Sequence, residues 1–230
     1  MKKLFKKYFL WFAVINLASF ALYYASSYLL GIDAIEYVRY FIGEAIDFAL
    51  PVVASALVAA AIGRFGFKGL ALAPIISLAR VIYSYPYFYL HLVGGGLLTD
   101  EALLLSLPFS LAVALIDCLA VSFLAFIIYM ITTGLARKSK REFGECISAI
   151  GTPFDFSSEF TVATLSVGGI IFVINLAAEI FDTVSYLVNY SGSYRIDEII
   201  YIVISLVMIL AELLLAQYLA IVVVKKTKDV

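Results

Sequence analysis

Charged residues are scarce in this chain: Asp, Glu, Lys and Arg make up only 14% of its 230 residues, whereas 64% are apolar. Soluble globular proteins contain about 25% charged and about 45–50% apolar residues. The mean hydropathy is +1.04. Apolar residues in such excess cannot all be buried in one water-soluble core, so lipid must cover part of them. The sequence therefore predicts an integral membrane protein.

Cysteine and histidine are also scarce, and basic residues are not in excess. Two cysteines and one histidine exclude a disulfide-rich secreted fold and a metal site built from several histidines. Sixteen basic residues against seventeen acidic ones exclude a generally basic nucleic-acid-binding protein. The sequence lacks G-x-x-x-x-G-K-[ST], H-E-x-x-H and any Ser or Cys beside a histidine motif. We therefore expect neither an enzyme nor a cofactor, and the sequence does not specify a metal.

Long apolar runs dominate what remains. A run of about 18 or more apolar residues is long enough to cross the hydrocarbon core of a bilayer as a helix. Six runs meet this condition, at 8–30, 38–63, 69–93, 103–134, 161–188 and 199–224. They predict an all-α, polytopic membrane protein, with residues 1–230 forming one domain, a bundle of six transmembrane helices.

The basic residues indicate how this bundle is oriented. With six crossings, both termini lie on one side of the membrane, and thirteen of the sixteen basic residues fall on that side. They are Lys2, Lys3, Lys6, Lys7, Arg64, Lys68, Arg137, Lys138, Lys140, Arg141, Lys225, Lys226 and Lys228. Because cytoplasmic loops carry an excess of Lys and Arg, we expect both termini to be cytoplasmic.

Polar residues follow one side of each predicted span. The hydroxyl-bearing members are expected either to form hydrogen bonds between spans or to line a polar interior. Seven ionisable residues lie within the spans. A charge at the bilayer centre costs at least about 2.5–3.5 kcal/mol, so these seven require partners or a function.

Three of the seven, Arg80, Asp117 and Glu212, lie near the midpoints of their spans. We expect Arg80 to pair with Asp117, Glu212 to be protonated or to share the pair, and Asn175 to lie in the same layer. The pair is interpreted either as a structural ion pair or as part of a relay for protons or a ligand.

The other four, Glu44, Asp47, Glu179 and Asp182, form two Glu-x-x-Asp pairs in the outer halves of spans 38–63 and 161–188. This spacing places both carboxylates of a pair on one helix face. If the two spans are neighbours, four carboxylates converge, and protons, metal ions or a cationic ligand must balance much of their charge. Pro51 is either a packing kink or leaves the carbonyl of Asp47 free for a cation.

An aromatic segment from Tyr83 to His91 ends span 69–93. Aromatic residues at this depth normally form a belt at the headgroup level. Alternatively, Tyr87 and His91 line an outward-facing cavity that receives a cationic ligand through cation–π contacts.

The longest predicted loop, about 136–158, contains the basic residues Arg137, Lys138, Lys140 and Arg141. Apolar residues then recur at spacings of three and four from Phe143 to Phe154, which predicts a short amphipathic helix. We expect it to lie on the inner leaflet. The basic cluster either binds anionic lipid or a cytoplasmic partner, or serves only to fix the topology.

Two hypotheses for function follow. In the first, the protein transports or binds a small cationic solute, or one coupled to protons or cations, through a carboxylate-lined interior. Glu44, Asp47, Glu179, Asp182, Tyr87 and His91 attract the ligand, and Arg80, Asp117, Glu212 and Asn175 form the coupling layer. The alternative is a non-transporting scaffold or assembly subunit of a larger complex, whose polar residues serve packing.

Overall fold

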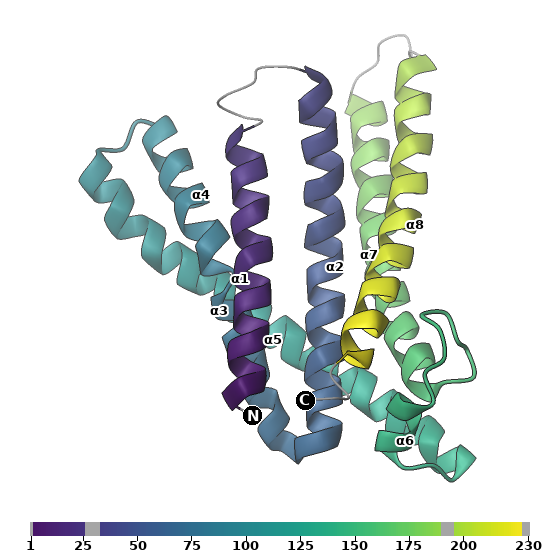
Figure 1. The fold of residues 1–230 in the computed structure, drawn as a ribbon. Helices are drawn as coiled ribbons and strands as arrows, with labels where there is room; N and C mark the ends of the chain where they lie inside the picture. The colour runs from purple at the N-terminus through teal and green to yellow at the C-terminus, as the bar shows by residue number, and fades with distance from the viewer. Residues whose placement is uncertain (1, 26–32, 190–195, 227–230) are drawn as a thin grey trace.

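A computed structural model describes residues 2–25, 33–189 and 196–226, without the side chains of 2–4, 33–47, 179, 182–183, 186–189 and 196–206. Every regular element in these ranges is a helix (Figure 1). The elements are α1 (Lys2–Tyr24), α2 (Asp33–Phe65), the 3₁₀ helix η2 (Gly66–Ala71), α3 (Leu72–Leu78), α4 (Val81–Gly94), α5 (Thr99–Ser139), α6 (Phe143–Ser148), α7 (Glu159–Asn189) and α8 (Ile196–Lys225).

Five segments of the described helices are long and apolar enough to cross a membrane. They are Phe5–Tyr24, Phe48–Gly94, Thr99–Ser139, Glu159–Ala178 and Val207–Lys225. Large apolar side chains are exposed along them, such as Leu104 on α5 and Phe181 just beyond the α7 segment, 76% and 71% exposed. The helices are therefore suited to a lipid environment, as the composition predicts.

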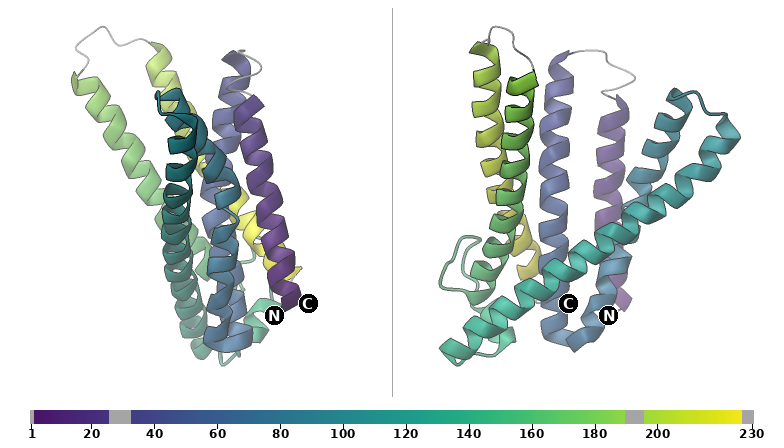
Figure 2. Two further views of the ribbon diagram at one scale, coloured as in Figure 1. Left: turned by 90° about the vertical axis from the view of Figure 1, so that its left-hand side faces the viewer. Right: turned by 180° about the vertical axis from the view of Figure 1, so that it is seen from behind.

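Helix α2 occupies the middle of the bundle, with α1 on one side and α7 and α8 on the other (Figures 1 and 2). It packs most extensively against α8 and α5. Every residue from Val52 to Ile62 is buried, and five of these eleven are alanine. Because lipid provides no hydrophobic drive for helices to associate, small side chains that let backbones approach are the main source of packing energy.

The chain reverses at η2, below α2 in Figure 1. Gly66 has a φ of +63°, which favours glycine. Gly69 is buried, and a Cβ atom built on it would collide with the backbone of Ala61 and Ile62. The return of the chain against α2 therefore requires glycine at position 69.

The predicted span 69–93 is not one continuous helix. Its first residues belong to η2, and α3 ends at Leu78 while α4 begins at Val81. Between them, the amides of Ala79 and Arg80 donate to the carbonyls of Ile76 and Ser77, three residues earlier, both at 3.0 Å. The helix thus tightens into a 3₁₀-type turn at Arg80.

The basic residues gather at one end of the bundle. The start of α1, the ends of α2, α5 and α8, η2 and α6 all lie at the lower end in Figure 1, whereas α4 meets α5 at the other end. Of the thirteen basic residues assigned to one side, twelve lie in the described part of the chain, in or beside these elements. Lys228 falls outside it.

The segment after α5 packs against the end of the bundle. Cys146 and Ile150 are buried, and the ring of Phe143 lies 5.2 Å from that of Tyr129 and 6.1 Å from that of Phe160. The expected amphipathic helix is shortened to the six residues of α6, and its apolar side faces the bundle. The basic residues before it, Arg137, Lys138, Lys140 and Arg141, are exposed.

Two side chains of α8 hold the loop between α6 and α7. The Gln217 amide donates to the carbonyls of Pro153 and Thr161, and the Lys225 ammonium donates to that of Gly151. Within the loop, hydrogen bonds from the Ser157 hydroxyl and from the amides of Gly151 and Ser157 hold the pKa of Asp155 below its ordinary value. These hydrogen bonds therefore order the loop and fix it against α8.

The close approach at η2 gives a first prediction. Gly69→Ala should destabilise the protein by about 1–3 kcal/mol, because the added methyl group has backbone rather than a flexible side chain as its neighbour. Thermal unfolding of the purified protein in detergent measures the change. The matched control is Gly134→Ala in α5, where a Cβ atom meets nothing within 4 Å. An equal melting temperature for Gly69→Ala and the wild type would contradict the structure.

Candidate functional site

Arg80 and Asp117 are brought together in the middle of the bundle, as expected from the sequence. Arg80 Nε lies 3.8 Å from Asp117 Oδ2, which joins the break between α3 and α4 to the middle of α5. The Arg80 guanidinium also lies over the ring of Tyr83, with Cζ 5.3 Å from the centroid. The side chains of Arg80 and Asp117 are 24% and 39% exposed, so neither side chain is fully buried.

A cavity of about 110 Å³ adjoins this ion pair. Four helices and the break after α3 contribute its walls. The lining residues are Phe12 and Asn16 of α1, Leu50, Pro51 and Ala54 of α2, Ile76 and Ser77 of α3, Arg80, and Asp117, Ala120 and Val121 of α5. One water needs roughly 10–15 Å³ of such space, so the cavity has room for several waters or one small solute.

Two buried oxygen atoms on the cavity wall have no hydrogen-bond partner among the described residues. Asn16 is 2% exposed and Ser77 is 4% exposed. The Asn16 amide nitrogen donates to the Phe12 carbonyl at 2.8 Å, but within the described part of the chain Asn16 Oδ1 and Ser77 Oγ have no partner. An unsatisfied buried group costs about 1–3 kcal/mol. A polar occupant of the cavity, either water or a ligand, would satisfy both.

The break at Arg80 belongs to the same site. The backbone carbonyl of Ser77 accepts the 3.0 Å hydrogen bond from the Arg80 amide, while the hydroxyl of the same residue has no partner among the described residues. The Arg80 carbonyl in turn accepts the Ser84 amide at 2.9 Å and the Ser84 hydroxyl at 3.1 Å. Helices interrupted near mid-depth are the elements from which many membrane transporters build their binding sites. Here the interruption coincides with the basic member of the ion pair.

An aromatic column runs from Arg80 along α4 toward the end of the helix. Tyr83 and Tyr87 stack with centroids 5.7 Å apart, and Tyr87 lies 4.2 Å from His91. Tyr23 of α1 faces the column, 5.3 Å from Tyr87 and 6.3 Å from His91. His91 Nδ1 lies 3.2 Å from the Tyr87 carbonyl oxygen and donates to it when it carries the proton. Tyr87 and His91 thus form a wall between α1 and α4.

The other residues expected in the midplane layer do not line the cavity. Glu212 is buried on α8, which packs against α2 on the side away from α1 (Figure 1). Asn175 is half-buried on α7, which packs against α5 and α8. The layer is therefore divided, with the ion pair on one side of α2 and Glu212 on the other.

The four outer carboxylates lie where the structure describes the backbone but not the side chains. Glu44 and Asp47 are in α2, and Glu179 and Asp182 are in α7. Over the described residues, the main neighbours of α2 are α8 and α5, and its contact with α7 is small. The expected convergence of the four carboxylates therefore stays a prediction, because their side chains lie outside the described part of the structure.

Several hydroxyl groups of the described helices donate a hydrogen bond within their own helix. Ser19, Ser55, Ser84, Ser106, Ser110, Thr132 and Thr164 each donate to the carbonyl four residues earlier. Such bonds neither link helices nor leave the donor free for a ligand. In these seven residues the donated hydrogen bond therefore stays within one helix and does not join two spans. Ser77 is the exception among the cavity residues.

A second polar cluster lies at the basic end. Glu159 accepts a 2.6 Å hydrogen bond from Ser139 and pairs with Arg141 at 3.4 Å. Cys146 is fully buried nearby, and its thiol donates to the Glu142 carbonyl. Burial, with a contribution from the Glu159 charge, raises the pKa of the Cys146 thiol to about 11. The thiol is therefore protonated at neutral pH and serves packing rather than chemistry.

Sequence reasoning identifies the ion pair but not the cavity. Asn16 and Ser77 carry a sequence signal, since they belong to the polar stripes of spans 8–30 and 69–93. Nothing in the sequence around Ala79 and Arg80, where Gly and Pro are absent, indicates the break. Comparison with known protein families, curated proteins and solved structures finds no match for this chain.

The Cys146 environment gives a second prediction. In a Cys118→Ala background, N-ethylmaleimide should modify native Cys146 far more slowly than a free thiol at pH 7.4. The rate should rise about tenfold per pH unit up to about pH 10, because only the thiolate reacts. Mass spectrometry of timed samples measures the rate, with detergent-denatured protein as the control. Rapid modification at pH 7.4 would contradict the buried, protonated thiol.

Proposed function

We propose that the protein is a six-span membrane protein, with both termini cytoplasmic, that transports or binds a small cationic or proton-coupled solute at the Arg80–Asp117 site. The observation that carries the proposal is an ion pair at mid-depth beside a cavity with two unsatisfied polar groups. Intramembrane ionisable residues are generally functional because their burial is costly.

The six-span topology is supported by the path of the chain. The apolar segment Phe48–Gly94 turns back at η2, so α2 and the pair α3 and α4 count as two passes. Together with α1, α5, α7 and α8 this makes six. The gathering of basic residues at the end that holds the start of α1 and the end of α8 favours a cytoplasmic location for that end.

Charge balance at the site favours proton or cation coupling. The ionised pair is neutral overall, so a proton or small cation that binds Asp117 leaves Arg80 without its counter-charge. Arg80 must then move toward another partner, and the Tyr83 ring already contacts its guanidinium. The 3₁₀-type turn at Arg80 is a place where such a movement can change the angle between α3 and α4.

The scaffold hypothesis retains one supporting observation. Seven hydroxyl groups in the helices donate to a carbonyl of their own helix, so the donors of these groups are unavailable to a solute. A scaffold in this sense would use the ion pair only to hold α5 against the break between α3 and α4. The two hypotheses predict different effects of neutralising Asp117 on the response to cations and on the folded yield.

Asp117→Asn tests the proposal. Thermal stability of the full chain in detergent is measured from pH 4 to pH 9 with a panel of sodium, potassium, magnesium, calcium, choline and putrescine. A cation bound at a hundred times its dissociation constant stabilises the native state by about 2.7 kcal/mol. We expect one cation, or the proton, to stabilise the wild type selectively and Asp117→Asn to lose this response at near-normal folded yield.

The matched control is Asp100→Asn, the same substitution at an exposed position in the first turn of the same helix. It should retain the wild-type response. Proteoliposomes containing a pH-sensitive dye then measure whether the stabilising cation drives proton flux. A response that is equal in wild type and Asp117→Asn would refute the site. A flat response in every protein, with loss of folded yield for Asp117→Asn alone, would favour the scaffold.

A further inference from the structure

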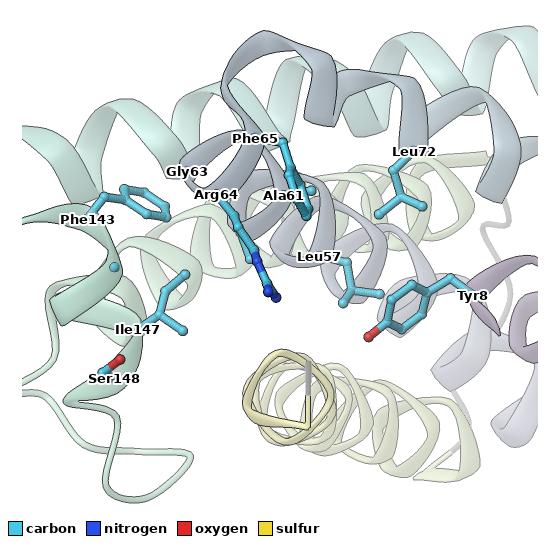
Figure 3. Close-up of a pocket in the computed structure, with 12 residues that line it drawn as sticks. Tyr8, Leu57, Ala61, Gly63, Arg64, Phe65, Leu72, Phe143, Ile147 and Ser148 are labelled. Atoms are coloured by element: carbon cyan, nitrogen blue, oxygen red, sulfur yellow. The ribbon is translucent and has the colours of Figure 1, made fainter. Parts of the chain in front are cut away.

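A larger cavity, of about 220 Å³, opens at the basic end of the bundle (Figure 3). Its polar lining residues are Tyr8, Arg64 and Ser148, and each of them already interacts with another group. The other residues of its wall are apolar or glycine. The polar side chains of this cavity therefore do not require a ligand, in contrast to those of the smaller cavity beside Arg80 and Asp117.

Two oxygen atoms of the smaller cavity determine which groups its occupant must carry. The Asn16 side-chain oxygen can only accept hydrogen bonds, because the amide nitrogen beside it already donates to the Phe12 carbonyl. The Ser77 hydroxyl oxygen can accept as well. Asn16 and Ser77 are 2% and 4% exposed, and among the described residues neither oxygen has a hydrogen-bond partner. An occupant with at least two N–H or O–H donors satisfies both oxygens.

Asp117 adds a third acceptor and a negative charge to the same wall. Its carboxylate pairs with Arg80, with Oδ2 3.8 Å from Arg80 Nε. An ionised carboxylate has about four acceptor positions, so Asp117 can receive another donor while it keeps its existing contacts. A charged donor gains more from this acceptor than a neutral one. The wall therefore offers three oxygen acceptors, one of which is anionic.

The opposing parts of the wall are apolar, and include Phe12, Leu50, Ile76 and Val121. Calcium and magnesium ions take six or more oxygen ligands, which this wall does not provide. Among the described residues, no group of three or more His, Cys, Asp or Glu side chains is placed to hold a metal ion. An alkyl group, in contrast, packs well against apolar side chains. The wall therefore fits an organic cation better than a divalent metal ion.

We propose that the cavity binds a small primary ammonium ion with a short alkyl group, such as methylammonium. A primary ammonium group has three N–H donors and no acceptor, which matches the oxygens of Asn16, Ser77 and Asp117. The alkyl group lies against the apolar part of the wall, and the volume of about 110 Å³ limits its length. The inference rests on the proposed function, because it names the class of cation that binds at the Arg80–Asp117 site.

Arg80 limits the charge that the cavity can receive. Its guanidinium and the ammonium ion share Asp117, and the two like charges repel each other. The Tyr83 ring, whose centroid lies 5.3 Å from Arg80 Cζ, stabilises the guanidinium when the ammonium ion attracts the carboxylate. A monovalent ammonium ion therefore suits the site better than an ion of higher charge.

Thermal stability of the full-length protein in detergent tests the proposal, in titrations with methylammonium or tetramethylammonium chloride at constant ionic strength. Both ions carry one positive charge, but tetramethylammonium has no N–H donor. The wild type should bind methylammonium at least tenfold more tightly than tetramethylammonium. Asn16→Leu and Ser77→Ala should each weaken methylammonium binding about tenfold, the loss expected for a charge-assisted hydrogen bond. The same two variants should change tetramethylammonium binding less than twofold.

The matched control is Ser110→Ala, which removes a fully buried hydroxyl group of α5 outside the cavity. This hydroxyl donates to the Ser106 carbonyl of its own helix, so the control should bind methylammonium as the wild type does. If Asn16→Leu reduces the folded yield, Ser77→Ala is the decisive variant, because it removes a single oxygen atom.

The outcomes separate this inference from the proposed function. A cation or proton response that Asp117→Asn abolishes, but that does not favour methylammonium or is unchanged in Asn16→Leu and Ser77→Ala, would overturn the inference alone. Such a result would assign the two oxygens to bound water. A methylammonium response of equal size in the wild type and Asp117→Asn, or no response to any cation or to pH, would overturn the proposed function and the inference together.

Discussion

Close packing around α2 is the constraint on which the rest of this structure depends. In lipid, helices gain little from hiding apolar surface from one another, so association depends on van der Waals contact between close backbones. The unbroken buried stretch from Val52 to Ile62, rich in alanine, allows α5 and α8 to approach α2 from different sides. The same requirement explains Gly69, which allows η2 to return against the α2 backbone. The cavity beside Arg80 and Asp117 also lies against this helix, which contributes Leu50, Pro51 and Ala54 to its wall.

The Arg80–Asp117 pair is the costly element within this packing. Two charges within long apolar helices are tolerated only if each compensates the other, and removing one partner leaves an uncompensated charge. A purely structural pair would be expected to satisfy its polar neighbours as well. Here Asn16 Oδ1 and Ser77 Oγ, beside the pair, have no partner in the part of the chain that the structure describes, and the side chain of Asp117 is 39% exposed. Unsatisfied groups beside an incompletely buried charge are more typical of a binding site than of a structural ion pair.

Much of the helical framework could be predicted from the sequence, because apolar length and basic-residue placement report on single segments. The Arg80–Asp117 contact was also predictable, since Arg80 is the one basic residue at mid-span and must find a carboxylate at its own depth. Which helices become neighbours depends on the whole fold. The sequence therefore could not predict that α2 packs mainly against α8 rather than α7. The apolar period of 143–154 likewise fits a lipid surface and a protein surface equally, and only the contacts of Phe143 decide between them. The interruption at Arg80 has no Gly or Pro at the break itself, so the local sequence does not mark it.

The position of Arg80 links the ion pair to a route toward the far end of the bundle. Its guanidinium is shared between Asp117 on one side and the Tyr83 ring on the other, and Tyr83 begins a column that continues through Tyr87 to His91. Any change in the charge of Asp117 alters this balance, because the attraction of Arg80 to the carboxylate competes with its attraction to the ring. The column is packed against Tyr23 of α1, so a displacement of Arg80 is resisted or transmitted by contacts between α1 and α4. On the proposed function, the ion pair would therefore hold Arg80 away from the aromatic column. A proton or cation that binds in the adjacent cavity and neutralises Asp117 would allow Arg80 to move toward the Tyr83 ring.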